Sequence, residues 1–138
     1  MQTWPRSENV AALDATTVEY LGRHWEDGWN NEDPDLIVEP FAADVVFSSP
    51  FISRLEGDAS VTTIEGFDAV RAYVAASFER ATPDIRYTLD TSYAGTDGVV
   101  LAYTVHHPTR GDLPGADLMT LDADGKVAQW RCHYPFEG

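Results

Sequence analysis

The acid Asp117 is the residue whose type and surroundings point most directly to chemistry. It lies in the stretch Gly115 to Tyr134, where apolar and polar residues alternate on both sides of the turn signal Asp124-Gly125, a pattern that predicts a β-hairpin. A two-residue turn would set Asp117 opposite Cys132, on a face that is otherwise apolar and aromatic. Carboxylates avoid such surroundings unless they are paired, hydrogen-bonded or used in catalysis. We therefore take Asp117 as the first candidate for a catalytic acid or base.

Two further side chains could assist this acid. If the loop 108–114 joins neighbouring antiparallel strands, Val105 pairs with Asp117, and Tyr103 and His107 become its diagonal neighbours, about 7–8 Å away on the same face. An acid, a phenol and an imidazole that converge in an apolar cavity could perform general acid–base catalysis, such as proton abstraction next to a carbonyl or loss of water from a hydroxy-ketone. The predicted catalytic residues are therefore Asp117, His107 and Tyr103.

Each of these residues also has a structural interpretation. Asp117 could be a buried acid that accepts a hydrogen bond from Tyr103 or from an indole N–H. His107 could be a histidine at a loop end that is either exposed or hydrogen-bonded to nearby groups. The four histidines of the chain show no metal-ligand spacing, so the sequence predicts no metal site and no cofactor.

Large aromatic residues recur at positions expected to point inward, and they would form a solid core or line a ligand cavity. Such cavities are mostly apolar with a few polar groups. The predicted substrate-binding residues are Trp25, Trp29, Phe47, Ser49, Phe51, Tyr73, Phe78, Met119, Trp130, Cys132 and Tyr134.

Periodicity places these residues on helices in the first half of the chain and on strands in the second half. The predicted elements are a helix over 16–31 for which Thr17 is the predicted cap, a short helix over 34–39, a strand over 45–49, a mostly irregular segment over 52–65 with a β-like run over 61–64, a helix over 67–80, strands over 85–93 and 99–107, and the hairpin over 115–134.

Helices followed by a meander of strands predict an α+β fold with an antiparallel sheet. A strongly curved sheet wrapped around two or three N-terminal helices would form a cone-shaped barrel with an internal cavity. The expected organisation is one domain over 16–138, preceded by an N-terminal arm over 1–15.

Composition limits the partners. The net charge of -14 and the pI near 4.3 argue against nucleic acid and anionic membranes, which bind clustered Lys and Arg. No apolar run approaches the ~18 residues of a membrane span, and a single cysteine, Cys132, fits a reducing compartment. We expect a cytoplasmic protein whose partner is a small hydrophobic molecule.

The order of elements, together with three sequence stretches, resembles the nuclear transport factor 2-like superfamily, in particular its SnoaL-like polyketide cyclases and ketosteroid isomerases. The resemblance covers nearly the whole chain after about residue 16 and implies the cone-shaped α+β fold. The stretches are Trp29–Asp33 followed by Phe41–Phe47, Gly66–Arg71, and Asp117–Leu121 followed by Asp124–Val127.

The resemblance assigns roles to some positions and not to others. Asp117 matches the acid of the SnoaL-like cyclases and the second oxyanion-hole acid of the ketosteroid isomerases, and His107 loosely matches a histidine of scytalone-dehydratase-like members. Ser49 stands where ketosteroid isomerases keep their general base, and Trp25 stands where they keep a tyrosine.

Two functions follow from this comparison. The first is a cofactor-independent isomerase, aldol-type cyclase or dehydratase acting on a small, largely apolar carbonyl compound in an internal cavity. The alternative is a non-catalytic small-molecule-binding or dimerisation domain. The resemblance also implies a homodimer through the outer face of the sheet, where the alternating polar residues Thr104, His106, Gln129 and Arg131 would lie.

Overall fold

The computed structural model describes residues 11–136 and shows an α+β fold, as predicted. The helices are α1 (Ala15–Asn30), α2 (Pro34–Val38), α3 (Pro50–Glu56) and α4 (Phe67–Arg80). The strands are β1 (Phe41–Ser48), β2 (Thr63–Glu65), β3 (Arg86–Ala94), β4 (Gly98–His107), β5 (Gly111–Leu121) and β6 (Val127–His133).

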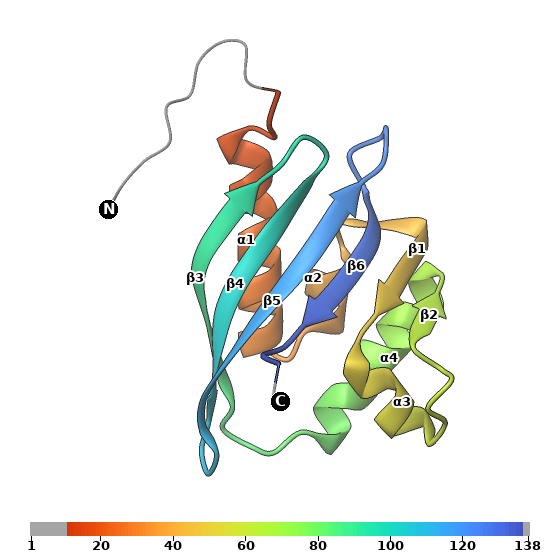
Figure 1. The fold of residues 1–138 in the computed structure, drawn as a ribbon, viewed down its shortest axis with the longest axis vertical. Coiled ribbons are helices and arrows are strands. Elements are labelled where there is room, and N and C mark those ends of the chain that lie inside the picture. Colours follow the sequence, from red (N-terminus) through yellow and green to blue (C-terminus); the bar gives the residue numbers. More distant parts are fainter. Residues whose placement is uncertain (1–10, 137–138) are drawn as a thin grey trace.

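The strands form one curved sheet in the order β2-β1-β6-β5-β4-β3 (Figure 1). The prediction of a purely antiparallel sheet is wrong, because β1 pairs with β6 in parallel. The reason lies in the chain order: two helices, α3 and α4, and four strands, β2 to β5, separate β1 from β6, so the chain can return in the same direction. β2 and β3 are free edges, so the sheet wraps around the helices without closing into a barrel.

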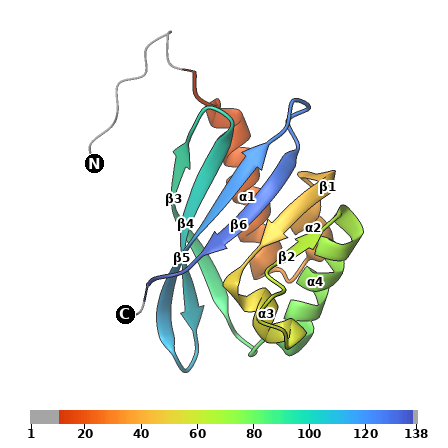
Figure 2. The same cartoon turned by 45° about the vertical axis from the view of Figure 1, so that its right-hand side comes forward.

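The helices cover one face of the sheet, and the other face is left open (Figures 1 and 2). α1 packs its buried residues Leu21 and Trp25 against the sheet, next to β3, and Trp25 also contacts Tyr103 on β4. α2 approaches α1 closely at Gly28, where a Cβ atom would lie 2.5 Å from Cγ1 of Ile37. Glycine at position 28 therefore lets the backbone of α1 contact the side chain of Ile37 in α2.

The start of α1 differs in detail from the prediction. Asp14 is the N-cap, and its carboxylate accepts a hydrogen bond of 2.8 Å from the backbone amide of Thr17, the residue predicted to cap. Of the predicted N-terminal arm, residues 1–10 lie outside the described residues. Leu13 lies just before α1, and its amide donates to the carbonyl of Gly95, so the end of this segment is tied to the turn between β3 and β4.

Helix α3 was not predicted, because the segment that contains it was interpreted as irregular. Ser49 caps it by accepting a hydrogen bond of 3.2 Å from the amide of Phe51, and Pro50 occupies its first turn. Ser-Pro is a favourable helix start, but a helix of seven residues is too short to display a period. It ends at Gly57, whose φ of 71° is left-handed.

The remaining boundaries differ by a few residues at most. β1 begins at Phe41 rather than at 45, while α4 has the predicted limits. Among the described residues, no helix is long and apolar enough to span a membrane.

Candidate functional site

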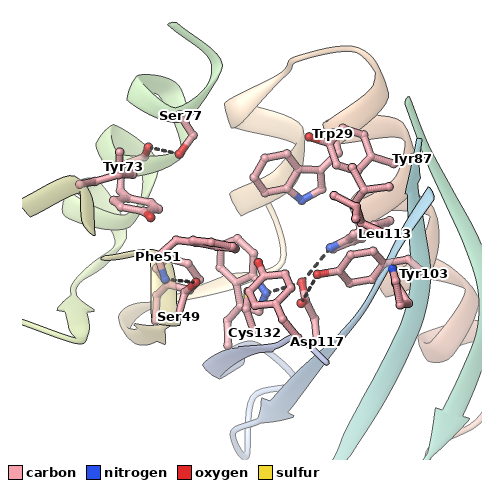
Figure 3. Close-up of a pocket in the computed structure, with 17 residues that line it drawn as sticks. Trp29, Ser49, Phe51, Tyr73, Ser77, Tyr87, Tyr103, Leu113, Asp117 and Cys132 are labelled. Atoms are coloured by element: carbon pink, nitrogen blue, oxygen red, sulfur yellow. Dashed lines mark hydrogen bonds between the residues drawn. The ribbon is translucent and has the colours of Figure 1, made fainter. Parts of the chain in front are cut away.

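Asp117 is buried on the concave face of the sheet, with 1% of its surface exposed. Its Oδ2 atom accepts hydrogen bonds of 2.9 Å from the indole nitrogens of both Trp25 and Trp130. Its Oδ1 atom accepts a hydrogen bond of 3.0 Å from the hydroxyl of Tyr103 (Figure 3). Three elements therefore converge on one carboxyl group: α1 supplies Trp25, β4 supplies Tyr103, and β6 supplies Trp130.

The predicted hairpin register is confirmed at the pairs that position this network. Asp117 lies opposite Cys132, and Met119 lies opposite Trp130. Trp130 is thus a diagonal neighbour of Asp117, close enough for its indole to reach the carboxylate.

The predicted register between β4 and β5 is wrong, and this moves His107 out of the site. Asp117 pairs with Leu101, whereas Val105 pairs with Leu113, because the turn is centred two residues earlier than expected. Tyr103 remains a diagonal neighbour of Asp117. His107 lies six residues beyond Leu101, which is about 20 Å along a strand.

His107 instead serves the turn between β4 and β5. Its Nδ1 atom accepts hydrogen bonds from the backbone amides of Thr109 and Arg110. This is the loop-end role that the sequence left open as the alternative.

Gly115 makes room for the Tyr103 phenol. It pairs with Tyr103 across β4 and β5, and a Cβ atom at position 115 would lie 2.6 Å from the Tyr103 hydroxyl and from two of its ring carbons. The phenol can therefore lie across β5 and reach Asp117 only because position 115 has no side chain.

Burial and hydrogen bonding act on the pKa of Asp117 in opposite directions. Burial, the larger effect, raises the pKa above its usual value, while the side chains of Trp130, Cys132, Trp25 and Tyr103 lower it by hydrogen bonding to the charged form. The net effect is a raised pKa. Burial also raises the pKa of Tyr103, and the neighbouring carboxylate adds to that shift.

A cavity of about 290 Å³ adjoins the network (Figure 3). It is lined by Trp25, Trp29, Phe47, Ser49, Phe51, Leu55, Tyr73, Ser77, Tyr87, Tyr103, Val105, Leu113, Pro114, Asp117, Trp130, Cys132 and Tyr134. This volume is near the lower end of the range for small-molecule pockets. Among the residues that the structure describes, the lining side chains include no Lys, Arg or His, so Asp117 is the group there most readily charged.

Most of the predicted substrate-binding residues line this cavity, and two do not. Phe78 packs against Trp29 with ring centroids 5.2 Å apart, and Met119 is buried in the core. Ser49 does line the cavity, although its hydroxyl is already used to cap α3.

The sequence interpretation missed six lining residues: Leu55, Ser77, Tyr87, Val105, Leu113 and Pro114. Alternation could have found Tyr87 and Val105, which share the inward faces of β3 and β4. Leu55 depends on the unpredicted helix α3, and Leu113 and Pro114 depend on the corrected register of β5.

Two details complete the chemistry of the site. Burial raises the pKa of the Cys132 thiol well above its usual value, and the nearby Asp117 adds to the shift, so the thiol is held in its uncharged, weakly reactive form. Within residues 11–136, no cluster of three or more His, Cys, Asp or Glu is arranged to hold a metal ion.

The fold and this lined cavity define a SnoaL-like protein. Residues 22–130 match the SnoaL-like domain. Since this match spans more than half of the chain, the protein belongs to the SnoaL-like family. No curated protein matches the sequence.

Solved structures support the fold. A SnoaL-like protein of unknown function from Burkholderia thailandensis superposes with a TM-score of 0.76 at 24% identity, over 90% of this chain and 99% of that one. A "putative ketosteroid isomerase" from Kribbella flavida gives 0.67 at 16% identity, over 89% and 81%. A protein of unknown function from Mesorhizobium loti, named NTF2-like, gives 0.67 at 16% identity, over 88% and 93%.

Proposed function

We propose that this protein is a cofactor-independent acid–base enzyme acting on a small, largely apolar carbonyl compound. The reaction class is isomerisation, aldol-type cyclisation or dehydration. The observation that carries the proposal is a buried carboxyl group with a raised pKa, Asp117, which lines an apolar cavity and is bonded to a phenol. Raised carboxyl pKa values in clefts are typical of catalytic acids and bases.

In this proposal Asp117 takes a proton from the carbon next to the substrate carbonyl. The indoles of Trp25 and Trp130 hold Oδ2 in place, which leaves Oδ1, the oxygen bonded to Tyr103, as the atom that exchanges the proton. The protonated Asp117 then returns its proton to another carbon of the enolate, to the alkoxide formed when the enolate attacks a second carbonyl, or to a hydroxyl group that the enolate expels as water. These three outcomes correspond to isomerisation, cyclisation and dehydration.

His107 is omitted from the proposed catalytic set because the turn occupies it. The remaining proposed catalytic residues are Asp117 and Tyr103. The family membership supports an isomerase or cyclase in general terms, and a structural neighbour from Agrobacterium tumefaciens is named a "putative isomerase of the SnoaL-like family".

A non-catalytic small-molecule-binding domain is the second candidate, and one observation favours it. Asp117 already accepts three hydrogen bonds and is 1% exposed, as expected for a structural acid. In that case the carboxylate organises the cavity wall and the ligand leaves unchanged.

Deuterium exchange separates the two candidates. β-Tetralone, an apolar ketone small enough for the cavity, is incubated in D₂O, and NMR measures the loss of its α-protons. We expect the protein to accelerate the exchange and Asp117→Asn to reduce that acceleration by about 100-fold or more. His107→Ala is the matched control and should retain it. A wild-type protein that binds the ketone without accelerating exchange would contradict the enzyme and support the binding domain.

We also propose a cytoplasmic homodimer that forms through the open face of the sheet, with no nucleic acid or membrane partner. On that face Thr104 bonds to Asp90, and His106 bonds to Thr88 and Asp112, so the surface is ordered and polar. Light scattering coupled to gel filtration gives the mass in solution. A monomer at micromolar concentration would contradict the dimer.

A further inference from the structure

The indole N–H of Trp29 is a buried donor without an acceptor. Within residues 11–136, its Nε1 atom is the only buried side-chain nitrogen or oxygen that makes no hydrogen bond. Trp29 lines the cavity, and in Figure 3 its indole nitrogen lies on the ring edge directed toward the side that holds Tyr103 and Asp117.

The other two indoles at the site are used differently. Trp25, one helical turn before Trp29 on α1, and Trp130 on β6 both donate to Asp117. Asp117 therefore accepts from two indoles at one oxygen. The indole of Trp29 has no such acceptor, although Trp29 lies on the same helix as Trp25.

Aromatic neighbours fix the Trp29 ring in this position. Its centroid lies 5.2 Å from that of Phe78, 5.5 Å from that of Tyr87 and 6.3 Å from that of Trp130. A buried N–H without a partner is unfavourable, and proteins retain such groups chiefly where they serve a function. An acceptor supplied by a ligand would remove that penalty.

The charge of the cavity limits what that acceptor can be. Within residues 11–136, the lining includes no cationic side chain, and it does include Asp117. A carboxylate or phosphate would be desolvated without a counter-charge and repelled by an ionised Asp117. An indole N–H only donates, so the group that binds it must be a neutral acceptor, such as the carbonyl oxygen of the proposed substrate.

We propose that the Trp29 indole N–H binds the oxygen of a neutral, largely apolar ligand, and thereby selects carbonyl compounds over hydrocarbons of the same shape. This inference rests on the proposed function in that the ligand is the same carbonyl compound. Trp29 is a specificity-determining residue here, and Asp117 and Tyr103 perform the chemistry.

The direct test is NMR of the tryptophan indoles in the full-length protein. The chain has four tryptophans, so a ¹⁵N-labelled sample gives four indole signals, and Trp29→Phe assigns one of them. We expect β-tetralone to move the Trp29 proton signal downfield, as a new hydrogen bond does, and tetralin, the hydrocarbon of the same shape, to leave it without that shift. An unmoved Trp29 signal with bound ketone would overturn the inference.

Affinity gives a second test. In the wild type we expect β-tetralone to bind about tenfold more tightly than tetralin, equal to about 1.4 kcal/mol for one net hydrogen bond. In Trp29→Phe the preference should disappear, while the loss of ring size weakens both ligands alike. Replacement of Trp29 by benzothienylalanine, which keeps the shape without the N–H, gives the same comparison if the phenylalanine variant is unstable. Equal affinities in the wild type, or no ketone binding, would overturn the inference.

The two proposals fail in different ways. If the Trp29 indole signal shifts and exchange is not accelerated, Trp29 binds the ligand but the protein is not the proposed enzyme. If exchange is accelerated and requires Asp117, but the Trp29 signal does not shift and the ketone is not preferred, the protein is the proposed enzyme and Trp29 does not bind the substrate oxygen.

Discussion

Gly115 lies directly opposite Tyr103 across β4 and β5, and the Tyr103 phenol fills the space where a side chain at position 115 would be. The hydrogen bond of 3.0 Å from Tyr103 to Asp117 therefore depends on a residue that makes no bond to either. A glycine in the middle of a strand weakens the strand. Here the close approach of the Tyr103 phenol explains why a glycine occupies position 115.

The substitution Gly115→Ala should displace the Tyr103 phenol, because the added Cβ would lie 2.6 Å from it. We expect a loss of about 1–3 kcal/mol in the free energy of unfolding, and deuterium exchange as slow as in Tyr103→Phe. The double variant tests the cause: if position 115 acts through the phenol, the two effects on exchange will not add. Additive effects would contradict this explanation.

The stability of the protein should carry a pH dependence due to Asp117. The pKa of this group is raised in the folded state above the model-compound value of 3.8, so the unfolded chain releases its proton first as the pH rises. The contribution of Asp117 is therefore complete below about pH 3.8 and decreases as the pH rises through the folded pKa, by at most about 1.4 kcal/mol per pH unit.

Urea unfolding of the wild type and of Asp117→Asn between about pH 4 and pH 8 measures this contribution. The wild type should lose stability relative to the variant as the pH rises, and the shared carboxylates cancel in the difference. A difference that grows with pH would mean that the hydrogen bonds outweigh burial and that the pKa of Asp117 is lowered.

The choice of replacement at Asp117 should decide how much stability is lost. In Asp117→Asn, the amide oxygen can still accept from Trp25 and Trp130, while the amide nitrogen donates to the Tyr103 oxygen. Asp117→Ala leaves both indole donors buried without an acceptor, so we expect it to cost about 3–5 kcal/mol, more than the asparagine variant. Equal unfolding midpoints in urea, with equal slopes, would contradict the observed network.

Removal of the phenol should raise the pKa of Asp117 further. Tyr103→Phe deletes one of the hydrogen bonds that stabilise the charged form, and burial then acts with less opposition. Titration of the Asp117 carboxyl by ¹³C NMR, assigned with Asp117→Asn, measures the shift. The prediction is wrong if the pKa falls or stays the same.

Loss of the imidazole at His107 should leave the site unaffected. In His107→Ala we expect unchanged exchange and an unchanged pKa of Asp117, since the ring bonds to the turn amides of Thr109 and Arg110. The free energy of unfolding should fall by about 1 kcal/mol. A tenfold fall in exchange would return His107 to the catalytic set.

Local patterns in the sequence were enough to predict the fold class, the helix α4 and the hairpin of β5 and β6. Alternation and the turn signal are properties of neighbouring residues, and they fixed the pairs Asp117 with Cys132 and Met119 with Trp130. They also placed Asp117 on an aromatic face, which is why this acid could be selected from the sequence alone.

The sequence could not fix the register between β4 and β5, because the length of a turn rich in polar residues is set by its tertiary contacts. The turn is centred two residues earlier than predicted, so the partner of Asp117 changes by four residues, from Val105 to Leu101; this keeps Tyr103 beside Asp117 and moves His107 away. The same limit applies to α3, whose seven residues are too few for a period and which depends on packing beside the cavity.

The sequence by itself determined most of the residues that face inward, because side-chain direction follows from the local period of a helix or strand. Only the tertiary structure decided their roles. Trp25 and Trp29 are one helical turn apart and equivalent in the pattern, yet one donates to Asp117 and the other has no acceptor. The difference arises because a hydrogen bond requires two atoms about 3 Å apart, and that distance is set by the packing of α1 against the sheet.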